Sequence, residues 1–105
     1  MDIQVTVAFQ IGQADALVRI KDFIKNAKKE YRDILTITHE EWNGFVYAFA
    51  GNSKGFSGSG TVGVNEADVI VSLALPVAAM LFKGKIERTI REKLTDILRP
   101  STTAV

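Results

Sequence analysis

Hydrophobic and polar residues alternate along several short segments of the chain, which is the pattern of half-buried β-strands. The segment IQVTVAF (3–9) is the first of them. The period then changes, because Leu17, Ile20 and Ile24 are spaced three and four residues apart. This spacing places them on one helical face, so the pattern predicts an amphipathic helix over 13–33.

The middle of the chain predicts strands joined by tight turns. The segments ILTITHEEW (34–42) and FVYAFA (45–50) alternate again, with Asn43 and Gly44 between them. An Asn-Gly pair is a strong hairpin signal, since a type I′ turn needs positive φ at both central residues. Both faces of FVYAFA are apolar, so we expect this strand to be covered on both sides, by helices or by a partner chain.

The stretch GNSKGFSGSG (51–60) is rich in glycine and serine. It lacks the GxxxxGK[ST] order of a phosphate-binding loop, and no helix dipole would point at an anion because no helix follows the glycines. Around Ser57 the G-x-S-x-G order of a hydrolase elbow is not met, and such an elbow lies at a strand-to-helix turn, whereas this stretch leads into another strand. From Phe56 onward the residues alternate, so we interpret the stretch as a turn leading into a strand with small side chains.

The segment VIVSLAL (69–75) predicts another strand, and a helix is predicted over 76–99. Pro76 suits the first position of a helix, where its missing N–H costs nothing. The apolar stripe of this helix begins at Phe82 and continues through Ile86, Ile90, Leu94 and Ile97. Gly84 lowers helix propensity by about 1 kcal/mol relative to alanine, which suggests close packing at that position.

The predicted order of elements is β-α-β-β-β-β-α. This order indicates an α+β fold, in which two amphipathic helices pack on one face of an antiparallel sheet. A chain of 105 residues is long enough to bury an independent core. We therefore predict a single domain over 1–99 and a flexible C-terminal tail over 100–105.

Composition and charge narrow the class of protein. The chain is 47% hydrophobic and 24% charged, which is typical of a globular protein, and it has no cysteine for a disulfide or a thiolate metal site. Neither a signal peptide nor a long apolar run is present, so we expect a cytoplasmic protein without a membrane span. The two predicted helices carry 12 of the 13 Lys and Arg residues but only 7 of the 12 acidic residues. This basic layer is typical of solvated helix faces.

No constellation of residues predicts catalysis or cofactor binding. His39 is the only histidine, and of its neighbours Glu40 and Glu41 only one can share its strand face. Two ligands are too few for zinc, so we predict no metal site, no cofactor and no enzymatic activity. Nucleic-acid binding is not favoured either, because the aromatic residues cluster in the first hairpin, away from the helical lysines.

Two groups of residues are candidates for contact with a ligand or partner. The segment PVAAMLF is apolar on nearly all sides, so Val77, Met80 and Leu81 form a possible hydrophobic contact surface. They either pack beneath the sheet edge or meet a partner subunit, a lipid-like ligand or a hydrophobic surface. The small residues Gly58, Gly60 and Gly63 are candidates for making room for a ligand between sheet and helix.

Residues 55–98 resemble the bacterial polyhydroxyalkanoic acid system, or granule-region, family. The similarity lies in Gly55 and Gly58 at a strand start, a strand ending in Leu73 and Leu75, and the following FKGKIE (82–87). The resemblance implies a cytoplasmic protein that accompanies the machinery for storing polyhydroxyalkanoate polyester, with the granule surface or granule proteins as partners. It supplies no catalytic residues.

Three hypotheses follow. The favoured one is a non-enzymatic accessory protein of polyhydroxyalkanoate storage, granule-associated or regulatory. The second is a small hydrophobic or acyl ligand-binding domain of helix-on-sheet type. The third is a homodimer in which sheet faces or edges pair.

Overall fold

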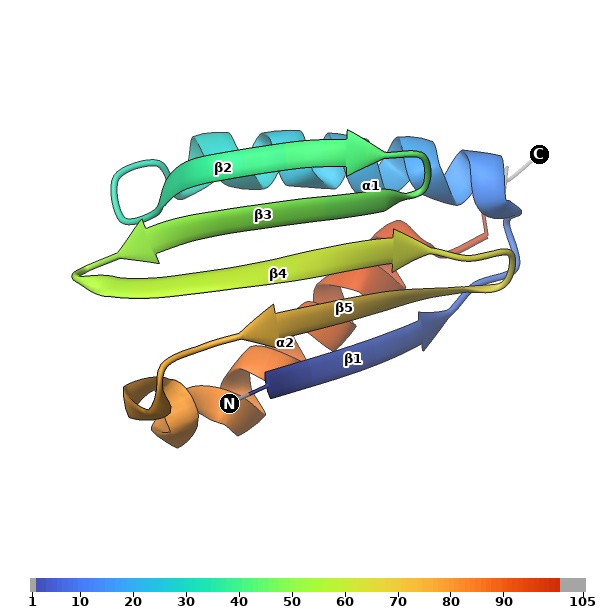
Figure 1. Ribbon diagram of the computed structural model, residues 1–105. Coiled ribbons are helices and arrows are strands. Elements are labelled where there is room, and N and C mark those ends of the chain that lie inside the picture. Colours follow the sequence, from blue (N-terminus) through green and yellow to red (C-terminus); the bar gives the residue numbers. More distant parts are fainter. Residues whose placement is uncertain (1, 101–105) are drawn as a thin grey trace.

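The computed structural model describes residues 2–100, which form one antiparallel sheet with its helices on one face (Figure 1). The elements in chain order are β1 (Asp2–Ala8), α1 (Gln13–Glu30), β2 (Thr36–Asn43), β3 (Val46–Ser53), β4 (Phe56–Val64), β5 (Asp68–Ala74), the 3-10 helix η1 (Val77–Phe82) and α2 (Lys83–Ile97). The predicted α+β fold and its order of elements are confirmed. The predicted tail lies, apart from Pro100, outside the described residues.

The five strands lie in the order β1-β5-β4-β3-β2. Strands β2 to β5 form a meander because short turns join consecutive antiparallel strands. The N-terminal strand β1 lies beside β5, and Val5 of β1 pairs with Val71 of β5. Strands β1 and β2 are therefore the two edge strands of the sheet.

The core lies between the sheet and the helices. Alternate residues of β1 are buried because strand side chains point to opposite faces. The buried hydrophobic residues are Ile3, Val5, Val7, Phe9, Ala16, Ile20, Tyr47, Val62, Val64, Val69, Val71, Leu94 and Leu98. Phe9 and Leu98 directly follow β1 and α2, and the others come from β1, β3, β4, β5 and both long helices, so one core holds the described chain together.

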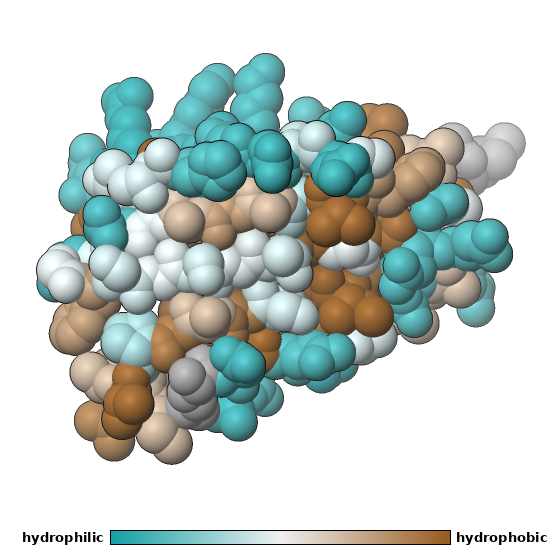
Figure 2. Space-filling view, in the orientation of Figure 1, coloured by the Kyte–Doolittle hydropathy of each residue, from teal (hydrophilic) through white to brown (hydrophobic). Residues whose placement is uncertain are grey.

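The second face of the sheet, here called the open face, is not covered by any described helix (Figure 1). Its pale central band in Figure 2 is the surface of small and weakly polar residues. Val46 on this face is 44% exposed, whereas its neighbour Tyr47 on the helix face is 3% exposed. Only one side of FVYAFA is thus covered within the described residues.

The predicted turn at Asn43 and Gly44 is in the right place but has the wrong geometry. Asn43 is still a strand residue paired with Val46, and Gly44 takes positive φ while Asn43 does not. The two positive φ values that a type I′ turn requires occur instead at Lys54 (51°) and Gly55 (85°), between β3 and β4. The stretch 51–60 is accordingly a hairpin, in which β3 continues through Ser53.

The predicted helices are longer than the observed ones. Helix α1 ends at Glu30, and the chain then turns through hydrogen bonds from Ile34 and Leu35 to the Tyr31 carbonyl. The last helix is not α-helical from Pro76, because residues 77–82 form a 3-10 segment with no buried residue. Such tighter turns are common at helix N-termini, and this one has no packed face to favour the wider α-helix.

Candidate functional site

Helices α1 and α2 form a V behind the sheet (Figure 1). Its closed end is fixed by Arg19 of α1, whose guanidinium donates hydrogen bonds of 3.1 Å and 2.6 Å to the carbonyls of Ile97 and Arg99 at the end of α2. Its open end lies at the side of the β3–β4 turn and of η1. The sheet forms the floor between the two helices, so the V leaves part of the core face uncovered.

The space inside the V is an apolar groove with two parts. The inner hollow has a volume of about 220 Å³ and is bounded by Ile24 and Ala27 of α1, Thr89 and Ile90 of α2, and Phe49 on the floor. The outer groove has a volume of about 520 Å³ and reaches Phe56, Pro76, Ala79 and Phe82. Leu35, Ile37, Phe49 and Leu73 border both parts, so the groove is continuous.

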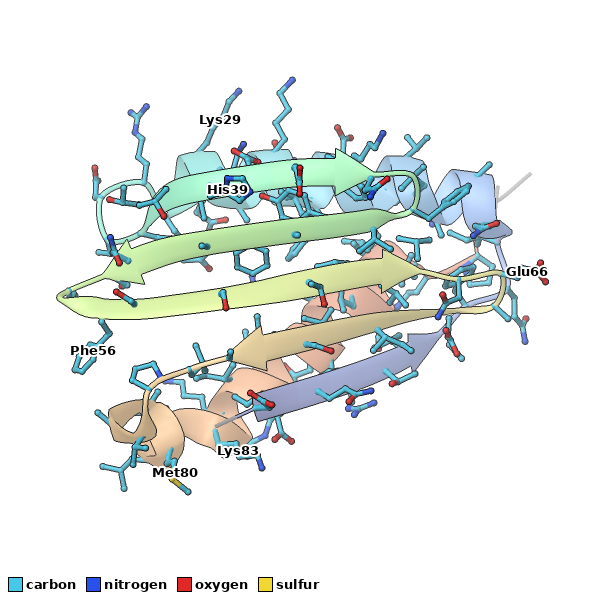
Figure 3. The ribbon with its side chains drawn as sticks, viewed as in Figure 1. Lys29, His39, Phe56, Glu66, Met80 and Lys83 are labelled. Carbon is cyan, nitrogen blue, oxygen red and sulfur yellow. The ribbon has the colours of Figure 1, made fainter. Side chains whose placement is uncertain are left out.

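Exposed hydrophobic side chains gather at the end of the molecule where η1 and the β3–β4 turn lie, and two of them, Phe56 and Phe82, border the outer groove. We call this cluster the apolar end; its members and their exposed fractions are Phe56 (53%), Val77 (73%), Met80 (51%), Leu81 (90%) and Phe82 (57%). Phe56 and Met80 come from the β3–β4 hairpin and from η1, and both lie at this end of the molecule (Figure 3). Figure 2 shows hydrophobic surface where η1 lies. Large hydrophobic patches of this kind mark contact sites.

The pattern of the sequence alone did not indicate that two members of the apolar end, Phe56 and Phe82, are exposed. Phe82 was predicted to begin the buried stripe of the last helix, which is wrong because η1 has three residues per turn and does not align Phe82 with the stripe of α2. Phe56 was identified only as a strand residue. Phe56 directly follows the Lys54-Gly55 turn, where a side chain has few neighbours. This position in the sequence is what could have indicated its exposure.

The three candidate glycines do not lie together. Gly58 borders the outer groove, where a Cβ atom would lie 3.2 Å from Leu75 Cδ2. At Gly60 the space on the helix side is already filled, since a Cβ atom would lie 2.6 Å from Leu73 Cδ2 and 2.9 Å from Phe49 Cζ. Gly63 is on the open face, and a Cβ atom there would meet nothing within 4 Å.

The suggestion of close packing at Gly84 is wrong. A Cβ atom at this position would also meet nothing within 4 Å. Gly84 is the second residue of α2, directly after the exposed η1, and no described element packs against it. Its small size is therefore not required by a close neighbour.

A hydrogen-bond network connects α1 to β2 beside the inner hollow. Lys28 Nζ contacts both carboxylate oxygens of Glu40, at 2.9 Å and 2.6 Å, and the Tyr47 hydroxyl donates to Glu40 Oε1 at 2.8 Å. The hydrogen bond from Lys28, aided by that from Tyr47, lowers the pKa of Glu40. Burial, together with the Glu40 carboxylate, raises the pKa of Tyr47.

An irregularity in β2 puts Glu40 in this position. The register shifts between Ile37 and His39, so that Ile37 pairs with Gly51 and His39 with Ala50. This bulge keeps both Ile37 and Glu40 on the helix face. His39 and Glu41 point to the open face, and the described residues contain no cluster of three acidic or histidine side chains that could hold a metal ion. Figure 3 shows His39 on that face.

Cationic side chains flank the inner hollow from both helices. Lys28 of α1 and Lys93 of α2 both border it. The charge of Lys28 is matched by Glu40, whereas no carboxylate among residues 2–100 lies within ion-pair distance of exposed Lys93. The lining surface of the hollow is entirely apolar, so both lysines border it with the methylene groups of their side chains.

The chain was compared with known protein families, curated proteins and solved structures. The model of one family, described as polyhydroxyalkanoic acid system protein (PHA_gran_rgn), matches residues 3–98. No curated protein and no solved structure matches the chain. Within the described part of the chain, no helix has the length and apolar character needed to cross a membrane.

Proposed function

Because the chain belongs to the family of polyhydroxyalkanoic acid system proteins, we propose that it is a non-enzymatic accessory protein of polyhydroxyalkanoate storage that docks on the granule surface. In this proposal residues 1–99 act as one domain in the cytoplasm. Val77, Met80 and Leu81 are the main contact residues, and Phe56 and Phe82 complete the contact surface. The family description names the storage system, and the apolar end provides the surface that contacts it.

The observation that carries the proposal is the exposure of the apolar end. Leu81 is 90% exposed and Val77 is 73% exposed, although each is a side chain that folding normally buries. Polyhydroxyalkanoate is an aliphatic polyester, so its surface can remove these side chains from water. Full burial of one leucine is worth about 1.5–3 kcal/mol, and this gain is nearly all available to Leu81 on docking.

The surroundings of the apolar end favour a peripheral contact. Exposed Lys54 precedes Phe56 by two residues, and Lys83, which pairs with Glu87 at 3.9 Å, lies directly after Phe82. These charged groups can remain in water while the apolar side chains touch the polyester, in the way that long cationic side chains do at other interfaces. The basic layer of α1 and α2 then faces the solvent or other granule proteins.

A sedimentation experiment tests the proposal. Purified protein is mixed with washed polyhydroxybutyrate granules, and the bound fraction is measured after centrifugation for the wild type and for Leu81→Glu. Loss of one leucine contact and introduction of a charge are expected to weaken retention by at least tenfold, since 1.36 kcal/mol corresponds to a factor of ten. The fold should be unaffected, because substitutions at exposed positions usually change stability by no more than about 0.5 kcal/mol.

A matched control separates docking from general hydrophobicity. Val18 on α1 is 64% exposed and lies away from the apolar end, so Val18→Glu makes the same kind of change elsewhere. This variant should bind granules like the wild type. Equal retention of all three proteins, or equal loss in both variants, would contradict docking through the apolar end.

A homodimer is a second hypothesis, supported by a different surface. Val46, 44% exposed, and the half-buried Ala48 and Ala50 form an uncovered strip on β3 of the open face. A second copy stacked on this face would cover both sides of the strand. Analytical ultracentrifugation tests this hypothesis, and a monomer at all concentrations would remove it.

A further inference from the structure

We propose that the inner hollow between α1 and α2 binds the chain of a single aliphatic carboxylate, with its carboxylate group at Lys93. This is a site for a soluble, monomeric amphiphile and is distinct from the apolar end, because Val77, Met80 and Leu81 do not border it. Three observations support this site: the volume of the hollow, its apolar surface, and the flexible side chain of Lys93, which borders the hollow and forms no ion pair within residues 2–100.

The hollow has the size and lining of an acyl-chain site. Its volume of about 220 Å³ exceeds the roughly 150 Å³ of an apolar cavity that is known to hold benzene. The surface that lines it is entirely apolar, and Ile24, Ala27 and Ile90 are only half-buried although they face the hollow. A chain lying between them would complete their burial.

The groove also has room for a chain longer than the hollow. The inner hollow continues into the outer groove past Leu35, Ile37 and Leu73. The outer groove has a volume of about 520 Å³, so extra methylene groups can run toward the apolar end along an apolar floor.

Charge determines the polar end of the ligand. Lys93 borders the hollow and has no carboxylate partner among residues 2–100, whereas Lys28 on the opposite side is neutralised by Glu40 at 2.6 Å. An anionic group therefore gains from Lys93, while a cationic group gains nothing at either lysine. An exposed ion pair is weak, so the apolar chain supplies most of the affinity and Lys93 orients the ligand.

Isothermal titration calorimetry with decanoate and with decanol tests the site. The wild type should bind decanoate saturably at one site per chain. Lys93→Met should weaken decanoate by about two- to fivefold and leave decanol unchanged, in line with the small energies of exposed ion pairs. Equal weakening of both ligands, or of neither, would overturn the assignment of Lys93.

Two variants fill the hollow from different helices. Ala27→Phe, from α1, and Thr89→Trp, at an exposed position of α2, should each weaken decanoate and decanol at least tenfold. Ala14→Phe makes the first substitution at an exposed residue of α1 that does not border the hollow, and it should bind normally. The proposal is overturned if the wild type shows no saturable binding, or if decanoate binds both filled variants as well as the wild type.

Granule docking and ligand binding can fail separately. Leu81→Glu should bind decanoate like the wild type, because Leu81 does not border the hollow. Ala27→Phe should still sediment with granules. Loss of decanoate binding in Leu81→Glu would instead place the chain at the apolar end and overturn the inner hollow as its site.

Discussion

Gly60 and Gly63 lie three residues apart on one strand, yet alanine should have opposite effects at the two positions. At Gly60 a Cβ atom would lie 2.6 Å from Leu73 Cδ2, 2.7 Å from the Ser72 carbonyl oxygen and 2.9 Å from Phe49 Cζ. The two side chains can move, but the Ser72 oxygen belongs to the neighbouring strand of the sheet. Gly60→Ala must therefore displace β4 from β5 or strain both.

The magnitudes follow from these contacts. Overpacking of this kind destabilises a protein by about 1–3 kcal/mol. The lower entropy of the unfolded alanine variant offsets about 0.4–1 kcal/mol of that loss. We expect Gly60→Ala to destabilise the protein by about 1–2 kcal/mol. At Gly63 no atom lies within 4 Å of the new methyl group and φ is not positive, so Gly63→Ala should stabilise by about 0.5 kcal/mol.

Urea unfolding followed by circular dichroism measures both changes. The midpoint concentrations should shift in opposite directions with the same m-value, because the surface exposed on unfolding is nearly the same. For a domain of this size, a difference of about 2 kcal/mol also separates the melting temperatures by roughly ten degrees. Two variants of equal stability, or a Gly63→Ala variant less stable than Gly60→Ala, would refute the assigned faces of β4.

Two further results are expected. Gly84→Ala should raise the free energy of unfolding by about 0.5–1 kcal/mol in urea titrations, because alanine favours the helix and no atom within 4 Å opposes it; a destabilised variant would contradict the open surroundings of Gly84. The network around Glu40 should make stability depend on pH at both extremes. The pKa of Glu40 is lowered, so its contribution to the free energy of unfolding is present above the ordinary pKa of 4.5 and is lost as the pH falls through the lower folded-state pKa. Glu40→Gln should therefore reduce the loss of stability at acid pH, measured by urea unfolding. The pKa of Tyr47 is raised, so its contribution to the free energy of unfolding is present below the ordinary pKa of 10.0 and is lost as the pH rises through the folded-state pKa. If Tyr47→Phe lost stability at alkaline pH as the wild type does, this assignment would be contradicted.

The sequence by itself determined the order of the elements and the face that each presents to the core. Alternation in β1 and β5, and the spacing of Ile20 and Leu94 on their helices, are properties of local periodicity, so they can be recognised without knowing any long-range contact. The same holds for the apolar segment at Val77, Met80 and Leu81, whose hydrophobicity exceeds what one buried face requires. The resemblance to the polyhydroxyalkanoic acid system family was also found from local motifs, and the family match over residues 3–98 confirmed it.

The tertiary structure decided how these elements combine into sites. The bulge beside Thr38 is not visible in the alternation, yet it brings Glu40 to Lys28 and Tyr47. The groove exists because α1 and α2 meet at one end and diverge toward the other (Figure 1), and at the closed end Arg19 donates to the carbonyl of Arg99, 80 positions away in the sequence. Whether a glycine borders open space or a neighbouring carbonyl depends on which strand lies beside it. Periodicity assigns a residue to a face, but pairing and crossing angle determine what that face meets.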